Sequence, residues 1–457
     1  MLKTFHGGVH PNDMKAPTAG KSIVELDPSK EMVYPMTQHI GAPATPIVNV
    51  GDYVYAGQKI AEAGGFVSAC IHSSVSGTVK AIEKRMHPNG LMVNSIVIED
   101  DEQDTICPDC KGHGDYKKLS PKEIIEIIKE AGIVGLGGAT FPTHVKLSPP
   151  PEANIDYVIV NAAECEPYLT SDYRSMLEIP NQIIGGLKIV MHIFGLKDGH
   201  IGIEDNKELA IETMSAMAAK ESDVNIHVHK LKTKYPQGGE KQLINAITRR
   251  KVGPGQLPWQ VGAIVCNVDT CRAIYQAVTN GLPVMTRIVT TGGQCAKNPG
   301  NYRVRIGTSL RTVYEKSGGF TQDPAKVIMG GPMMGMAITN LDRPVAKPYN
   351  ALICLTEDPV EMADGQLTHC IRCGRCARAC PVGLVPQMLA FYAERKDYDQ
   401  YIKLHGLDCL SCGACTYICP AKRPLMQLFK MTKGVIEHNE ANEAAKANQK
   451  EKEAVEV

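Results

Sequence analysis

The chain of 457 residues is long enough for roughly three or four domains. Its 49 lysine and arginine residues balance its 49 aspartate and glutamate residues, and this zero net charge argues against a nucleic acid partner. The longest apolar stretches, such as residues 183–196, are interrupted by charged residues, histidine or glycine, so we expect no membrane-spanning helix. The N-terminal residues lack a signal peptide's apolar core. In a reducing compartment, the 16 cysteines indicate metal ligands and free thiols.

The first predicted unit is a small β-structure at about residues 32–99, where apolar and polar residues alternate between glycine turns. Residues 48–58 predict a strand, a turn and a strand. The pattern resembles the flattened barrel of lipoyl and biotinyl domains, which attach a cofactor to a lysine between their two halves. No lysine occurs between Lys59 and Lys80, so we expect a structural or docking role.

A polar, acidic linker follows, with Cys107, Cys110 and His113. These residues could form half of a zinc site. No second half is apparent nearby, which favours free thiols.

The next segment alternates helices and strands. Ser120 is a predicted N-cap, with Pro121 in the first turn of an isoleucine-rich helix. Residues 157–161 form a continuous apolar run typical of a buried parallel strand, and the alternation continues to about residue 276. We therefore predict a doubly wound, Rossmann-like α/β domain.

A glycine loop, Gly135-Leu-Gly137-Gly138, follows the first helix of this domain. Its backbone N–H groups could approach a phosphate, and Lys146 could pair with the same phosphate. The loop follows a helix rather than a strand, unlike the Rossmann fingerprint, and a lone glycine loop is more often an ordinary turn.

Polar residues also follow the predicted strands, where ligands of open α/β sheets gather. They are Asn161, Glu164 and Glu166 after one strand, and Asn267 and Thr270 after another. Two carboxylates and an amide could bind a flavin or a nicotinamide, or could simply form a solvated turn.

Residues 281–345 change in character to short strands and turns. Residues 286–293 and 301–306 are predicted strands, and residues 330–335 form a tight glycine loop. We predict a small β-rich module here, in which the methionines serve packing.

Residues 346–434 hold two copies of the spacing C-x₂-C-x₂-C-x₃-C-P, which binds 4Fe–4S clusters in bacterial ferredoxins. In that arrangement three thiolates of one run and the fourth of the other run share a cluster. The first predicted ligand set is Cys370, Cys373, Cys376 and Cys419, and the second is Cys409, Cys412, Cys415 and Cys380. Zinc sites or disulfides are the alternatives, which the trailing Cys-Pro disfavours. The tail, residues 435–457, is predicted to be a solvated helix or disordered.

Several segments resemble the NADH-binding flavoprotein subunit of respiratory complex I. Residues 135–146 resemble its FMN loop, and residues 161–167 are similar to its Asn-x-x-Glu-Ser-Glu-Pro segment. Residues 267–270 resemble its Asn-Val-Glu-Thr segment. Gly239-Glu240-Lys241 resembles its Gly-Glu-Glu, with Lys241 in place of the second glutamate.

The whole chain resembles the RnfC family, the C subunits of Rnf electron-transport complexes, more closely, in residues 3–11, 38–43, 163–169 and 235–242 and in both cysteine runs. The resemblance implies a multidomain α/β plus β protein. Its expected units are an N-terminal barrel-sandwich hybrid with linker (1–112), an FMN- and NADH-binding α/β domain (113–280), a β-grasp module (281–345), an α-helical dicluster ferredoxin domain (346–434) and a polar tail (435–457).

The resemblance also implies the cofactors FMN, NAD(H) and two 4Fe–4S clusters. Lys146 would hold the FMN phosphate, and Glu166 and Phe141 would lie on the nucleotide side. The full set of expected cofactor-binding residues is Gly135, Gly137, Gly138, Phe141, Lys146, Asn161, Glu164, Glu166, Glu240, Asn267 and Thr270.

The function implied is that of the NAD(H)-reacting subunit of a membrane-bound ferredoxin:NAD⁺ oxidoreductase that moves Na⁺ or H⁺. We expect peripheral association with the cytoplasmic face of the membrane, through membrane and ferredoxin-like subunits. Two alternatives remain at this point: a flavin-dependent reductase of the cobalamin-reductase type, and a non-enzymatic iron–sulfur wiring subunit. Flavin content separates the second alternative from the other two readings.

Overall fold

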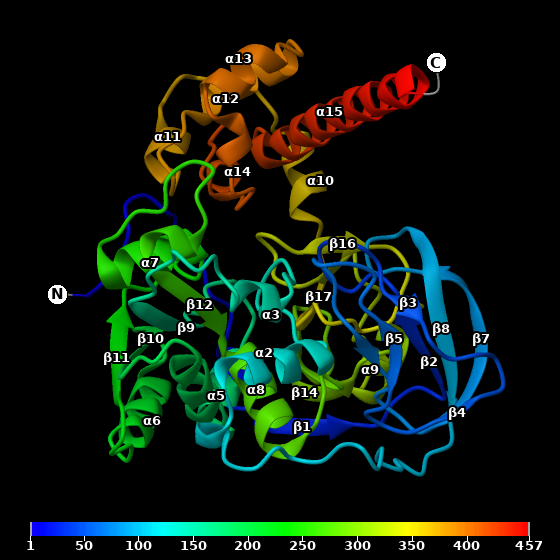
Figure 1. Ribbon diagram of the computed structural model, residues 1–457. Helices are drawn as coiled ribbons and strands as arrows, with labels where there is room; N and C mark the ends of the chain where they lie inside the picture. The colour runs from blue at the N-terminus through cyan, green and yellow to red at the C-terminus, as the bar shows by residue number, and fades with distance from the viewer. Residues whose placement is uncertain (1, 456–457) are drawn as a thin grey trace.

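The computed structural model describes residues 2–455 of the chain, and the side chains of residues 2–443. Four units are visible in Figure 1. Within the described residues, no helix has the length and apolar character needed to cross a membrane.

The N-terminal unit contains two antiparallel sheets that share one apolar core, which agrees with the predicted barrel. The turn expected in residues 48–58 lies at Asn49–Asp52, where the Asp52 N–H donates to the Asn49 carbonyl at 3.1 Å. One sheet holds β2 (Glu31–Pro35), β8 (Met92–Asp100), β7 (Gly77–Met86) and β4 (Tyr53–Val54), and the other holds β3 (Thr45–Pro46), β5 (Lys59–Glu62) and β6 (Ile71–His72).

The second unit is a parallel sheet in the order β11-β10-β9-β12, as predicted for a doubly wound domain. Alternate residues of its strands point to opposite faces, so Val158 and Val160 join one core and Ile159 joins another. The strands are β9 (Tyr157–Ala162), β10 (Asp198–Glu204), β11 (Asn225–Leu231) and β12 (Ala263–Asn267). The helices α5 (Pro180–Ile193), α6 (Glu208–Ala218) and α8 (Val268–Asn280) contribute to the first core, and α7 (Glu240–Thr248) to the second.

Helix α2 (Pro121–Glu130) precedes this sheet and begins as predicted. The Ser120 hydroxyl accepts from the Glu123 N–H at 3.3 Å, and the Glu123 carboxylate accepts from the Ser120 N–H at 2.7 Å. This capping box satisfies backbone donors that a helix start otherwise leaves unpaired. The start of α2 is therefore defined by its own local sequence.

The third unit is a mixed sheet in the order β1-β14-β13-β17-β15-β16. The expected unit limits place β1 with the barrel and β17 with the cysteine runs, but in the structure both strands complete this sheet. Backbone pairing with distant segments explains this placement, because unpaired strand edges are unfavourable. The strands are β1 (Ile23–Leu26), β13 (Thr286–Gly292), β14 (Gly300–Arg305), β15 (Lys326–Met329), β16 (Met336–Ile338) and β17 (Ala351–Leu355).

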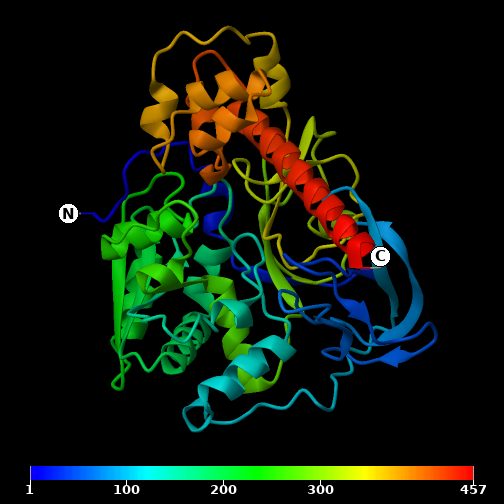
Figure 2. The same cartoon turned by 45° about the horizontal axis from the view of Figure 1, so that its top comes forward.

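The fourth unit is a group of short helices that holds both cysteine runs and follows α10 (Pro359–Asp364). Leu389, Tyr401 and Phe429 form its small core. Helix α15 extends from it as a long rod in both views (Figures 1 and 2), so the predicted tail is helical as far as residue 455. The remaining helices are α11 (Arg375–Ala379), α12 (Pro386–Glu394), α13 (Tyr398–Lys403), α14 (Ala414–Tyr417) and α15 (Leu425–Val455).

The N-terminal segment, residues 3–26, crosses three of the four units. Lys3 forms a bridge with Leu231 at the end of β11. The Gly8 N–H donates to the carbonyl of Ala379 at 2.9 Å, and Val9 exchanges two backbone hydrogen bonds with Tyr235. Strand β1 then enters the third unit. The segment therefore ties the cysteine-rich unit to the α/β sheet.

Candidate functional site

The predicted cofactor residues lie at the carboxyl ends of β9 and β12, where Asn161 and Asn267 are register partners. The Asn161 side chain donates to the Gly238 carbonyl at 2.7 Å. The Asn267 side chain accepts from the Asp269 N–H at 2.8 Å and so caps α8. Both amides therefore order the backbone around the strand ends.

The glycine loop covers the start of α8. The Leu136 N–H donates to the Thr270 hydroxyl at 2.9 Å. A Cβ on Gly137 would lie 2.5 Å from the Asn267 amide, so only glycine permits this approach. A Cβ on Gly138 would meet nothing within 4 Å, so this part of the loop is open. The Gly135 N–H donates to the carbonyl of half-buried Phe141 at 2.9 Å.

Lys146 and Glu240 meet on the α7 side of these strand ends. Lys146 ends α3 (Thr143–Lys146), and its Nζ lies 2.7 Å from Glu240 Oε1 and donates to the Val265 carbonyl at 3.0 Å. Burial alone would lower the pKa of Lys146, but the Glu240 carboxylate outweighs burial and raises it. Lys146 therefore carries a positive charge, and Glu240 is its carboxylate partner.

The two glutamates that follow β9 have different surroundings. The Glu164 carboxylate accepts from the N–H groups of Asp172 and Tyr173 at 2.7 and 3.2 Å, at the start of α4 (Ser171–Glu178). Burial raises the pKa of Glu164. The Glu166 carboxylate instead accepts from the N–H groups of Met333 and Met334, in the third unit.

Sequence reasoning missed a buried charged group beneath the glycine loop. Asp269 pairs with Arg272 and Arg287, and Arg287 also donates to the Leu136 carbonyl at 2.6 Å. Asp172 accepts from the Asn267 amide at 2.7 Å. Arg287 comes from β13 of another unit, so no local spacing predicts the contact. The only hint of this contact in the sequence is that Arg287 places a charge within a predicted strand.

Replacing Asp172 with asparagine should change how stability depends on pH. Burial, then Glu164 and Asp269, raises the pKa of Asp172 from 3.8 to about 7. The folded state therefore holds a proton that the unfolded state releases, and the contribution of Asp172 to stability falls as pH rises from 4 to 7. Asp172→Asn cannot ionise, so its stability relative to wild type should improve by up to about 3 kcal/mol between pH 5 and 7 and stay level above. Thermal unfolding at several pH values measures this, and parallel profiles would refute it.

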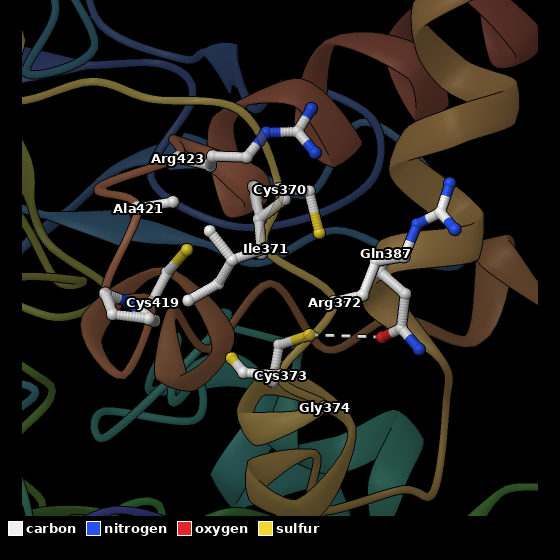
Figure 3. A pocket seen from close by; sticks show the side chains of 12 residues that line it. Cys370, Ile371, Arg372, Cys373, Gly374, Gln387, Cys419, Ala421 and Arg423 are labelled. Carbon is white, nitrogen blue, oxygen red and sulfur yellow. Dashed lines mark hydrogen bonds between the residues drawn. The ribbon is translucent and has the colours of Figure 1, made fainter.

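The eight predicted cluster cysteines line two cavities of similar size. The first holds Cys370, Cys373, Cys376 and Cys419, beside Gln387 and Arg372 (Figure 3). The second holds Cys380, Cys409, Cys412 and Cys415. In each cavity one cysteine comes from the other run, which is the predicted pairing.

The donor sets fit iron–sulfur clusters. Across the side chains that the structure describes, no three histidine, cysteine or carboxylate groups converge on a point as one metal ion requires. Four thiols around a cavity instead suit a polynuclear cluster. The Leu384 and Ser411 N–H groups donate to the sulfurs of Cys380 and Cys409, at 3.3 and 3.4 Å, and such bonds stabilise thiolate ligands.

The two cavities differ in exposure and in neighbours. Cys370 and Cys373 of the first cavity are exposed, whereas Cys380, Cys412 and Cys415 of the second are buried. Cys412 belongs to a buried apolar group with Val9, Tyr235, Ala379 and Ala414, against which Cys165 and Met333 pack. The second cavity therefore lies toward the α/β unit, and the first faces solvent.

Four family models match separate parts of the chain. They are the RnfC barrel sandwich hybrid domain (residues 3–103), the Nuo51 FMN-binding domain (128–276), the SLBB domain (288–337) and the 4Fe-4S dicluster domain (369–422). These matches confirm the predicted fold class and the predicted order of the four units.

The chain is also similar to complete proteins. It is 47% identical over 449 residues to the C subunit of the proton-translocating ferredoxin:NAD(+) oxidoreductase complex of Clostridium ljungdahlii, covering 98% of this chain and 96% of that protein. It is 44% identical over 433 residues to the C subunit of the Na(+)-translocating complex of Acetobacterium woodii, covering 95% and 97%. A chain of an NAD+-reducing NiFe hydrogenase matches with 20% identity and a TM-score of 0.49, over 71% of this chain and 64% of that one. The chain belongs to the RnfC family, the C subunits of ferredoxin:NAD(+) oxidoreductase complexes.

Proposed function

We propose that this chain is the NAD(H)-reacting peripheral subunit of a membrane-bound ferredoxin:NAD⁺ oxidoreductase, and that it passes electrons between NAD(H), FMN and two 4Fe–4S clusters. The main support is the position of the second cysteine cavity. Its Cys412 packs with Tyr235, and Gly238 of the same loop bonds to Asn161 at the strand ends. A flavin-type site and a cluster site therefore share one short loop.

The strand-end residues suit FMN. Lys146 supplies a cation for the phosphate, and the open backbone at Gly138 gives the phosphate access to N–H groups. Arg287 and Asp269 hold the loop and the start of α8 in place from below. When bound, FMN converts hydride transfer into single-electron transfer. Phe141 remains our candidate for the nucleotide side.

The exposure of the cysteines indicates an order of transfer. The buried second site lies next to the flavin site and would exchange electrons with it. The exposed first site would exchange electrons with ferredoxin-like partner subunits. We expect the chain to associate with the cytoplasmic face of the membrane through other subunits. The two relatives are named for different ions, so H⁺ and Na⁺ both remain possible for the complex.

Anaerobic purification followed by addition of NADH tests this function. We expect about eight irons, about eight sulfides and one FMN per chain, and NADH should bleach the flavin and reduce the clusters. Full iron content with no NADH response, even after FMN is added back, would instead indicate a non-enzymatic wiring subunit. A flavoprotein that never co-purifies with membrane subunits would favour the cobalamin-reductase type.

A further inference from the structure

We propose that Glu166 is a positioning residue that holds the Gly330–Gly335 loop of the third unit against the second cysteine site, and thereby fixes the path from flavin to cluster. This inference rests on the proposed function and assigns to Glu166 a role other than nucleotide binding. Residues 330–335 are called the bridging loop below.

The first contact is between Glu166 and the bridging loop. The Glu166 Oε2 accepts from the Met333 N–H at 3.0 Å, and the Glu166 Oε1 accepts from the Met334 N–H at 2.9 Å. A Cβ on Gly331 would overlap Oε2, so the loop closes tightly around the carboxylate. Both carboxylate oxygens are therefore engaged by backbone donors of another unit.

The second contact is between the bridging loop and the second cysteine cavity. The Met333 carbonyl lies 3.2 Å from the position of a Cβ on Gly413. Gly413 lines the cavity and follows Cys412 directly, with a φ of 77° that favours glycine. The Met333 side chain packs against the group that contains Cys412. The bridging loop thus contacts Glu166 on one side and the wall of the cluster cavity on the other.

The backbone of Glu166 is fixed to the flavin side. Lys15 is buried, and its ammonium donates to the carbonyls of Glu164 and Glu166, at 2.9 Å each. The Cys165 sulfur accepts from the Gly238 N–H at 3.2 Å. Glu166 cannot shift without moving the loop that contacts Asn161. The carboxylate therefore connects the flavin side to the cluster side through short, directional bonds.

Electron transfer slows steeply as the distance between donor and acceptor grows. Loss of the hydrogen bonds between Glu166 and the bridging loop should therefore slow electron transfer from flavin to cluster. Hydride transfer from NADH to flavin should keep its rate. If Glu166 instead bound the nucleotide, its loss would slow the reduction of flavin by NADH. Cluster reduction would then be slowed to the same rate.

The test compares Glu166→Ala and Glu166→Gln with wild type, as complete proteins loaded with FMN and clusters. Anaerobic stopped-flow records flavin bleaching by NADH and the later reduction of the clusters. We expect unchanged bleaching, and cluster reduction slowed at least about tenfold in Glu166→Ala and less in Glu166→Gln, which keeps one acceptor. Glu212→Gln makes the same chemical change on the exposed face of α6 and should leave both rates unchanged.

Hydrogen–deuterium exchange makes the test independent of NADH. Both Glu166 variants should exchange faster than wild type at Met333 and Met334, whether or not flavin is bound. Two results would overturn the inference. One is slower flavin bleaching in the Glu166 variants with cluster reduction limited only by that bleaching. The other is unchanged hydrogen–deuterium exchange in the bridging loop. If the Glu166 variants exchange faster than wild type as expected, but wild type does not react with NADH, only the proposed function is refuted.

Discussion

Replacing Cys380 with serine should remove the cluster of the other run. Cys380 lies in the second cavity with Cys409, Cys412 and Cys415, although it ends the first run. Iron should fall from about eight to about four per chain, because serine is a poor substitute for a soft thiolate ligand. NADH should still bleach the flavin, but the remaining cluster should stay oxidised because the flavin-side site is lost. Iron analysis and electron paramagnetic resonance of the NADH-treated protein measure both effects.

Cys419→Ser is the matched control for this prediction. Cys419 ends the second run but lines the first, exposed cavity. This variant should also lose about four irons, yet NADH should still reduce its one remaining cluster. If Cys380→Ser instead loses the same resonance signal as Cys370→Ser, each run holds its own cluster and the crossed assignment is wrong.

Replacing Lys146 with alanine should weaken FMN binding by about thirtyfold, the loss of roughly 2 kcal/mol expected for a hydrogen bond to a charged group. Lys146 is our candidate for holding the phosphate, and its present partners are Glu240 and the Val265 carbonyl. Titration of FMN into flavin-free protein, followed by flavin fluorescence, gives the dissociation constant.

Riboflavin distinguishes a phosphate contact from general damage, because it lacks the phosphate. Its affinity should be the same in wild type and Lys146→Ala. Lys241→Ala is a suitable second control, since Lys241 lies on α7 and donates to the Gly253 carbonyl. An equal loss of affinity for FMN and riboflavin would show that Lys146 maintains the fold of the site and does not bind the phosphate.

Local patterns predict much of this protein from its sequence. The spacing of the cysteines predicts which thiols share a cavity, because the first three cysteines of each run wrap one site and the fourth reaches the other site. The capping residues of α2 and the apolar run of β9 define their elements without help from distant residues. The meeting of Asn161 with Asn267 follows from placing polar residues at the carboxyl ends of parallel strands.

The same reasoning from local patterns does not predict the contacts between units. Glu166 stands in a motif that suggests a ligand, but its partners are backbone N–H groups of the third unit, which carry no sequence signal. Arg287 and Asp269 meet across two units in the same way. The pairing of β1 with β14 joins segments far apart in the chain, so strand patterns alone give no partner. The roles in FMN and nucleotide binding stay predictions.

The path of residues 3–26 affects the order in which the contacts of this protein form during folding. The backbone bonds from Gly8 to Ala379 and from Val9 to Tyr235 join residues that are more than two hundred positions apart in the chain. Contacts of such long sequence separation form late in folding, because closing a long loop costs entropy before it brings any gain. The bond from Gly8 to Ala379 therefore waits for the first cysteine run, whereas the bonds of Val9 with Tyr235 can form earlier. The cysteine-rich unit would then dock onto a segment that already lies along the α/β sheet.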